Sequence, residues 1–361
     1  MRRSVHRLVT VLILLPALLY GGLAALATGS AFAAEPATRA PHIALILPLN
    51  SPSFSRHAGA VKQGFVAAAK LDGKGAPPIR IYADTEETLN VLTIYEQAIE
   101  MGAQLVVGPL TRSSVAALAA STLVTVPTLA LNTLEPGSPQ PARMYLFGLA
   151  IELEARQTAR LAVDDGRRNA FVVSDDTPFS KRMRQAFIEE FARLGGTVVA
   201  EFAYGADQAS LIKLRNAANL GVADVAFLAL DYARAGTARP YLGNSLAVFA
   251  TSQVNAGKNL LAARELEQVR FVDMPWLLQA DHPAVMVYPR PQFGDAVDFE
   301  RLYALGIDAY RIGLELLRQH RDPVLDGVTG RIRLTRDQQF VRELTAAQYV
   351  DGKAVILGEP H

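Results

Sequence analysis

Apolar residues fall along this chain in short continuous runs that alternate with longer stretches of helical spacing. The first run spans Ile43 to Leu47, and Ala58, Val61 and Phe65 then recur at intervals of three and four residues. The alternation repeats as far as residue 130 and predicts further strands over 79–82, 105–107 and 126–130 and further helices over 89–101 and 113–120. Successive units of this kind build a parallel sheet that is covered by helices on both faces.

A second round of the same alternation follows residue 149. It predicts helices over 151–163, 180–194 and 210–219 and strands over 170–173, 197–202, 225–230, 246–249 and 269–272. The period is then lost until an amphipathic helix over 299–318. Two C-terminal stretches, Gly330–Thr335 and Lys353–Leu357, alternate with a period of two, which predicts antiparallel strands.

The two rounds predict an α/β protein of two Rossmann-like lobes, each a parallel sheet flanked by helices, joined by a multi-strand hinge. We expect lobe 1 to combine residues 42–147 with 273–325, lobe 2 to comprise 148–272, and residues 326–361 to add C-terminal strands at the hinge. The chain should cross between the lobes near Phe147, near Phe271 and between Arg318 and Val328. Lobes of about 150 residues have the usual size of a domain.

The N-terminal residues have the pattern of an export signal. A basic start, Met1 to Arg7, precedes a largely apolar run from Leu8 to Ala27 and the small-residue site Ala31-Phe32-Ala33. We expect residues 1–33 to be a cleaved signal peptide, residues 34–41 to be an N-terminal tail, and the mature protein to be periplasmic. The alternative is an uncleaved membrane anchor, because the apolar run is roughly long enough to span a bilayer.

The amino-acid composition argues against disulfide bonds, a lipid anchor and nucleic acid as a partner. The 361 residues include no cysteine, so we expect neither disulfide bonds nor the lipidated cysteine of a lipoprotein. Lys and Arg number 36 and Asp and Glu number 35, and the resulting net charge of +1 does not favour nucleic acid as a partner. Hydrophobic residues make up 50% of the chain, which is enough to build an ordinary core without staples.

Candidate ligand residues lie in the loops that follow the predicted strands, because open parallel sheets bind ligands at the carboxyl ends of their strands. Helices that begin in such loops also present free N–H groups to anions. The candidate set comprises Ser51, Thr111, Arg112, Ser113, Ser114, Asn132, Thr133, Phe179 and Asp231. For several of these side chains the alternative role is helix capping, which is worth about 1 kcal/mol.

Signals of catalysis are weak in this sequence. The six histidines do not show the spacing of a zinc site, and no G-x-G-x-x-G follows a predicted strand. The Gly73–Pro78 stretch lacks the spacing of a phosphate-binding loop, and the serine motifs G-x-S-x-G and K-T-G are missing. We therefore expect a binding protein with no catalytic residues, no metal and no cofactor.

Several stretches in a particular order carry a resemblance to a known family. They are Ile43–Leu49, Gly64–Ala68, Val106–Leu110, Pro127–Asn132, Tyr303–Tyr310 and Leu325–Gly330. Together they resemble the LppC-like family of penicillin-binding protein activators, and the architecture resembles the type I periplasmic binding protein fold. The resemblance covers nearly all of the chain that follows the export signal.

The resemblance implies a periplasmic protein without enzymatic activity that docks on a peptidoglycan synthase, a class A penicillin-binding protein, and stimulates it. Characterised activators of this type are outer-membrane lipoproteins with an additional N-terminal domain of helical repeats. This sequence has no cysteine to carry a lipid, and its βα units begin shortly after the export signal. We therefore expect the protein not to be lipid-anchored.

A competing hypothesis is a solute receptor that delivers an amino acid or a small carboxylate to an ABC permease. The sequence is also similar to the branched-chain amino acid receptors of the same fold. That similarity implies that Ser113, Ser114 and Thr133 grip the ligand from one lobe while Phe179 and Asp231 close over it from the other. Arg112 adds a positive charge that suits an anion.

Overall fold

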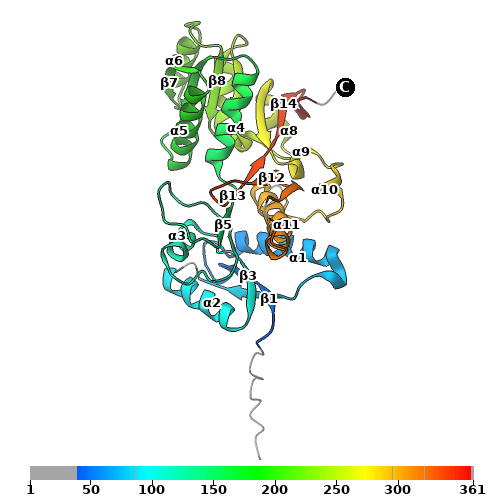
Figure 1. Ribbon diagram of the computed structural model, residues 1–361. Coiled ribbons are helices and arrows are strands. Elements are labelled where there is room, and N and C mark those ends of the chain that lie inside the picture. Colours follow the sequence, from blue (N-terminus) through cyan, green and yellow to red (C-terminus); the bar gives the residue numbers. More distant parts are fainter. Residues whose placement is uncertain (1–38, 86, 295, 321, 359–361) are drawn as a thin grey trace, which may run out of the picture. The chain divides into compact units, whose positions relative to one another are not determined.

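The computed structural model describes residues 39–358 except 86, 295 and 321 (Figure 1). The predicted signal peptide over 1–33 and most of the predicted tail over 34–41 lie outside the described residues. The described chain contains two β-sheets with helices on both faces of each. Within these residues no helix is both long enough and apolar enough to cross a membrane.

The first sheet is formed by the N-terminal round of strands together with three strands from near the C-terminus. Its order is β11 (Val324–Gly327), β12 (Gly330–Leu334), β13 (Gln339–Glu343), β5 (Met144–Phe147), β4 (Thr128–Ala130), β3 (Ala103–Val107), β1 (His42–Leu47) and β2 (Ile79–Ala83). The strands from β13 to β2 run parallel, whereas β11 and β12 pair antiparallel with their neighbours. The antiparallel pairing of β12 confirms the antiparallel strand predicted over 330–335 and makes the sheet mixed.

The second sheet has the same construction. Its order is β15 (Lys353–Ile356), β14 (Thr345–Val350), β10 (Val269–Asp273), β9 (Ala247–Ala250), β8 (Val225–Ala229), β6 (Asn169–Ser174) and β7 (Thr197–Ala203). The five strands from β10 to β7 are parallel, and β14 and β15 add to them antiparallel. Both sheets thus combine a parallel βα core with C-terminal strands at one edge.

Helices cover both faces of each sheet, and alternate side chains of one strand pack against the helices of opposite faces. Ile43, Leu45 and Leu47 of β1 contribute to the core under α1 (Ser55–Asp72) and α11 (Val297–Leu317). Ala44 and Ile46 contribute to a separate core with α2 (Thr88–Glu100) and α3 (Arg112–Ala120). Successive side chains of a strand point to opposite faces, so a strand that is apolar throughout is buried on both.

The second sheet is covered in the same way. The helices α4 (Ile151–Asp164) and α5 (Pro178–Arg193) pack on one face. The other face is covered by α6 (Gln208–Ala218), α7 (Tyr232–Ala238) and α8 (Leu260–Glu265). Two short helices, α9 (Pro275–Leu278) and α10 (Pro283–Met286), lie in the segment whose period the sequence lost. The strands and long helices predicted from periodicity are all present.

Within the described residues the chain passes between the sheets three times. The first two passages, from β5 to α4 and from β10 to α9, lie close to the places expected near Phe147 and Phe271. The third lies at Leu344, between β13 of the first sheet and β14 of the second, and not between Arg318 and Val328. The sequence did not indicate it because β13 and β14 carry few large apolar residues in alternation.

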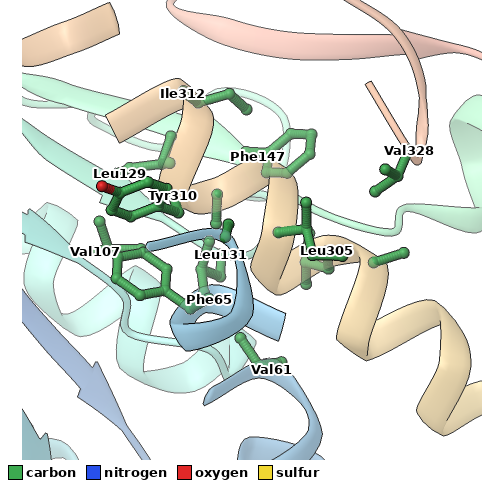
Figure 2. Close-up of a cluster of buried hydrophobic side chains, with 14 of the residues drawn as sticks. Val61, Phe65, Val107, Leu129, Leu131, Phe147, Leu305, Tyr310, Ile312 and Val328 are labelled. Carbon is green, nitrogen blue, oxygen red and sulfur yellow. The ribbon is translucent and has the colours of Figure 1, made fainter. Parts of the chain in front are cut away.

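The core of the first lobe is built around the contact between α1 and α11 (Figure 2). Phe65 of α1 meets the ring of Tyr310 of α11 edge to face at a centroid distance of 5.2 Å. Val61, Leu305 and Phe147 fill the space around this pair. Aromatic pairs in this arrangement add to the stability that burial alone provides.

Two glycines permit the close approach of these helices. A Cβ atom on Gly64 would lie 1.9 Å from the carbonyl oxygen of Tyr303, and one on Gly306 would lie 2.0 Å from the carbonyl oxygen of Val61. Both obstacles are backbone atoms, which cannot rotate away. The contact therefore requires glycine at both positions.

The turn between β11 and β12 is attached to the same helix. The buried carboxylate of Asp308 accepts hydrogen bonds from the backbone N–H and the hydroxyl of Thr329, both at 2.7 Å. Burial raises the pKa of Asp308, while Arg311 and the bonds from Thr329 favour its charged form. The motifs around residues 306 and 327 thus hold the C-terminal strands to the first lobe.

We predict that Gly64→Ala destabilises the protein by more than about 2 kcal/mol, because the added methyl group forces α1 and α11 apart. Gly59→Ala on the same helix is the matched control, since a Cβ at Gly59 meets nothing within 4 Å. The control should raise stability by about 0.5 to 1 kcal/mol through helix propensity. Urea unfolding of the two variants measures both changes, and equal stability of the two would refute the close contact.

Candidate functional site

Four charged side chains are buried where the chain passes between the two sheets. Glu154 lies on α4 and Asp273 ends β10, both in the second lobe, whereas Arg301 lies on α11 and Arg342 on β13 of the first. Their side chains are between 1% and 8% exposed. Buried charges are tolerated only when they are paired and hydrogen-bonded, so these residues tie the two lobes together.

Arg301 makes most of these contacts. Its Nη2 donates to Oδ2 of Asp273 at 2.9 Å and to the backbone carbonyl of Ser252 at 2.8 Å, and its Nη1 donates to Asp298 at 2.8 Å. Burial opposes the charge of Arg301, but Asp273, followed by Asp298 and Glu154, raises its pKa above the ordinary value. The guanidinium therefore stays charged and holds a helix of one lobe against a strand end of the other.

Glu154 forms the second centre of this network. Its Oε2 accepts a bond of 2.6 Å from the hydroxyl of Ser252, and its Oε1 lies 3.4 Å from Nη2 of Arg342. Burial raises the pKa of Glu154, and the charge of Arg342 only partly offsets that effect. Its carboxylate is thus easier to protonate than an exposed one.

A cavity of about 660 Å³ opens beside Arg301. The first lobe contributes His57, Phe299 and Asp298 to its lining, and the second contributes Asp231 and Gln253. Its other lining residues are Tyr232, Asn255, Ala256, Lys258, Asn259, Ala296, Val297 and Arg301. Residues from both lobes with donors and acceptors around one space can hold a small polar molecule.

The lining includes one histidine, His57. The rings of His57 and Phe299 lie 5.2 Å apart, and Nδ1 of His57 is buried without a hydrogen-bond partner in the described chain. The cavity has no serine, threonine or cysteine among its lining residues that could act as a nucleophile. No group of three or more potential metal ligands occurs in the described part of the chain. The geometry supports binding.

The hydroxyl cluster predicted at the start of α3 acts largely on its own helix. Thr111 is the N-cap, and its Oγ1 accepts from the backbone N–H of Ser114 at 3.3 Å and donates to Ser114 Oγ at 2.7 Å. Ser113 Oγ lies 3.2 Å from Thr111 Oγ1 and is exposed. The capping alternative is therefore realised for Thr111, while Ser113 remains accessible.

Arg112 joins the two lobes at the surface. Its Nη1 donates to Glu135 at 2.9 Å, and its Nη2 donates to Glu152 at the start of α4 at 3.0 Å. Glu152 also lies 3.6 Å from Nε of Arg182, whose guanidinium is 5.6 Å from the ring centre of Phe179. The structure thus links the predicted residues Arg112 and Phe179 through two residues that the sequence did not single out.

The remaining predicted residues are spread over separate loops. Ser51 is buried, and its Oγ accepts from the backbone N–H of Phe54 at 2.9 Å at the start of α1. Asn132 donates to the carbonyl of Leu110 at 2.9 Å and accepts from the N–H of Thr133 at 2.9 Å, which ties two loops together. These contacts are local, and a ligand role for these residues stays a prediction.

Asp231 lies both at a helix start and in the cavity. Its Oδ1 accepts from the N–H of Arg234 at 2.9 Å as the N-cap of α7, and its Oδ2 forms an ion pair with the guanidinium of the same arginine. It is the one member of the predicted set in the lining of the interlobe cavity. The structure therefore does not gather the nine predicted residues into one site.

The sequence analysis did not identify these buried charged residues, although their positions on the apolar faces of helices are a signal in the sequence. Arg301 and Asp308 occupy the apolar face of the helix predicted over 299–318, and Glu154 occupies the apolar face of the helix that begins at residue 151. A charged residue in an apolar stripe is unusual, since it is buried only when it has a partner. The identity of the partner depends on the fold.

We predict that Glu154→Gln changes how stability depends on pH. An acid whose pKa is higher in the folded than in the unfolded protein weakens folding as pH rises through that interval. The stability difference between the variant and the parent should thus shift in favour of the variant as pH rises from about 4 to about 7. Glu96→Gln, which changes an exposed glutamate on α2, is the control. Parallel profiles of urea unfolding for parent and Glu154→Gln would contradict a raised pKa.

Comparison with known sequences gives a family for the chain. The match is to the family described as LppC putative lipoprotein, over residues 24–225 and 223–352. A penicillin-binding protein activator LpoA from Haemophilus ducreyi is 29% identical over 323 residues, which cover 86% of this chain and 54% of that protein. This chain spans about half the length of the curated relatives it matches.

Two solved structures share the fold along their whole length. The C-domain of LpoA (YraM) from Haemophilus influenzae, described as a regulator of PBP1A, is 25% identical with a TM-score of 0.74, over 88% of this chain and 100% of that one. A putative branched-chain amino acid ABC transporter from Chromobacterium violaceum is 39% identical with a TM-score of 0.73, over 86% of this chain and 100% of that one. Both confirm the predicted type I periplasmic binding protein fold.

The family match extends over more than half of the chain, and its extent agrees with the order of motifs found in the sequence. The protein belongs to the LppC family.

Proposed function

We propose that this protein is a non-catalytic periplasmic regulator that binds a peptidoglycan synthase of the class A penicillin-binding protein type and stimulates it. The observation that carries the proposal is that the chain aligns with the whole of the Haemophilus influenzae LpoA C-domain, which is described as a regulator of PBP1A. The activator name of the curated relatives supports the same role. A cavity lined by residues of both lobes, with no serine, threonine or cysteine among them, agrees with regulation through protein contacts.

The network at the hinge suggests how the protein acts. Arg301, Asp273, Glu154 and Arg342 hold the lobes through buried ion pairs, and Arg112 adds a surface ion pair between them. A regulator that presents a surface spanning both lobes benefits from such a preorganised arrangement, because less conformational freedom is lost on binding.

The proposal predicts that the purified protein stimulates glycan polymerisation by the class A synthase of the same organism several-fold and is retained with it in affinity pull-downs. Arg301→Met should lower this stimulation, because it leaves the buried carboxylate of Asp273 without its ion-pair partner and loosens the lobes at a cost of about 3 to 5 kcal/mol. Lys213→Glu, on the exposed face of α6, is the control. A parent protein that neither binds nor stimulates the synthase would overturn the proposal.

A solute receptor for an ABC permease is the second candidate. The cavity between the lobes favours it, as does the full-length similarity to the structure described as a putative branched-chain amino acid ABC transporter. Asp231 at the start of α7 would then face the amino group of an amino acid, and Arg301 its carboxylate.

The two candidates differ in the expected contents of the cavity. A receptor should carry a stoichiometric small molecule in native mass spectrometry of protein purified from the periplasm, and Asp231→Ala should remove it. A regulator by protein contact should be free of ligand, and Asp231→Ala should leave synthase stimulation within about twofold of the parent. A bound ligand combined with no effect on any synthase would favour the receptor.

A further inference from the structure

A second hollow of about 540 Å³ lies on the first lobe. One wall is a face of α1, and the other is the segment 287–291. The α1 residues are Lys62, Gln63, Val66, Ala67, Lys70 and Leu71, and the segment residues are Val287, Tyr288, Pro289, Arg290 and Pro291. Tyr303 of α11 completes the lining. We call this feature the α1 groove.

The α1 residues of the groove fall on one face of the helix. Lys62, Val66 and Lys70 are spaced four apart, and the other three follow each of them by one position. From the first to the last, this face extends roughly 14 Å along the helix axis, which equals two to three helical turns. The groove therefore has the length of a short helix.

Apolar side chains at the groove are exposed to an unusual degree. Leu71 is 58% exposed and Val287 is 51% exposed, and Met286, which precedes the segment, is 66% exposed. Clustered exposed apolar residues with a polar rim are typical of surfaces that bind another protein. Scattered single ones would need no explanation.

The charged residues that line the groove are all positive. Lys62, Lys70 and Arg290 line it, and no described residue of the lining is acidic. Neither lysine forms an ion pair with a carboxylate in the described chain. The two nearby acids already have partners, since Asp72 accepts from the hydroxyl of Tyr310 and Glu300 accepts from the indole N–H of Trp276.

The walls of the groove are held in place. Nη1 of Arg290 donates to the carbonyl of Trp276 at 2.6 Å, and its guanidinium lies 4.0 Å from the centre of that indole. The hydroxyl of Tyr303 donates to the carbonyl of Pro289 at 3.0 Å. A groove that is formed before binding limits the entropy lost on association.

We propose that the α1 groove binds a short acidic amphipathic helix of the partner protein. Apolar side chains of that helix, spaced three and four apart, fill the space between α1 and the segment 287–291, and its carboxylates pair with Lys62, Lys70 and Arg290. The concave shape, with three cations and no acid in the lining, fits such a helix better than it fits a flat membrane surface. The inference rests on the proposed function in that the helix is assigned to the peptidoglycan synthase.

The first experiment measures binding of the purified synthase to charge-reversed protein. Lys62→Glu combined with Lys70→Glu should weaken binding about tenfold, and the affinity of the parent should fall as salt is raised. Lys213→Glu, which reverses an exposed lysine on a helix of the other lobe, should change binding less than about twofold. Thermal unfolding checks that both variants are folded, and Val287→Asp gives a second test that leaves α1 intact.

The second experiment identifies the occupant. A photoreactive phenylalanine analogue replaces Leu71 or Val287, and the control position is Leu220, which is 70% exposed in the second lobe. Irradiation in the presence of the synthase should yield crosslinks from the groove positions to an acidic helical segment, found by mass spectrometry, and none from the control.

The outcomes separate the groove from the proposed function. If the parent binds and stimulates the synthase but the groove variants and crosslinks are indistinguishable from the controls, the groove proposal is wrong and the function stands. If the parent does not bind the synthase, the proposed function fails, and this assignment of the groove fails with it. Crosslinks to a second copy of the chain, or binding to vesicles of anionic lipid that Lys62→Glu abolishes, would also overturn the proposal.

Discussion

The arrangement of the two lobes depends on one buried guanidinium. Arg301 is anchored in α11 of the first lobe, yet it donates to Asp273 at the end of β10 and to the backbone of Ser252, both in the second. Transferring a charge out of water is expensive, and only ion pairs and hydrogen bonds make the transfer tolerable. The partners of Arg301 come from separate segments, so they meet only when the passages of the described chain between the lobes are in place. This requirement makes the hinge specific for one arrangement of the lobes.

Arg301 belongs both to the cavity and to the network that joins the lobes. Arg301 lines the cavity while it holds the lobes together, and Glu154 and Arg342 reinforce the same junction. In a receptor that closes on its ligand, the lobes move about such a hinge. In a regulator, the same bonds keep a composite surface in a constant shape. The ion pair between Arg112 and Glu152 adds to this restraint at the surface.

The motifs that carry the family resemblance have a physical explanation in the first lobe. Gly64 and Gly306 let the backbones of α1 and α11 touch. Asp308 of α11 accepts hydrogen bonds from Thr329 in the turn between β11 and β12. These residues lie far apart in the sequence but in one layer of the structure. The same close packing positions the face of α1 that lines the α1 groove. The family pattern is thus mainly a pattern of packing, which explains why it predicts the fold more directly than the function.

The sequence by itself determined the βα order, the two lobes and the main helices, because strands that are apolar throughout and helices with a period of 3.6 are local properties of the chain. It also offered helix capping as the alternative role of such hydroxyl and carboxylate side chains, and the structure shows this capping at Thr111 and Asp231. Only the tertiary structure decided that β13 and β14 divide between the sheets, that Arg301 pairs with Asp273, and that Asp231 faces a cavity while most other candidates do not. Those features depend on which distant segments meet, and pairing between strands or buried charges leaves little trace in the local pattern of either partner.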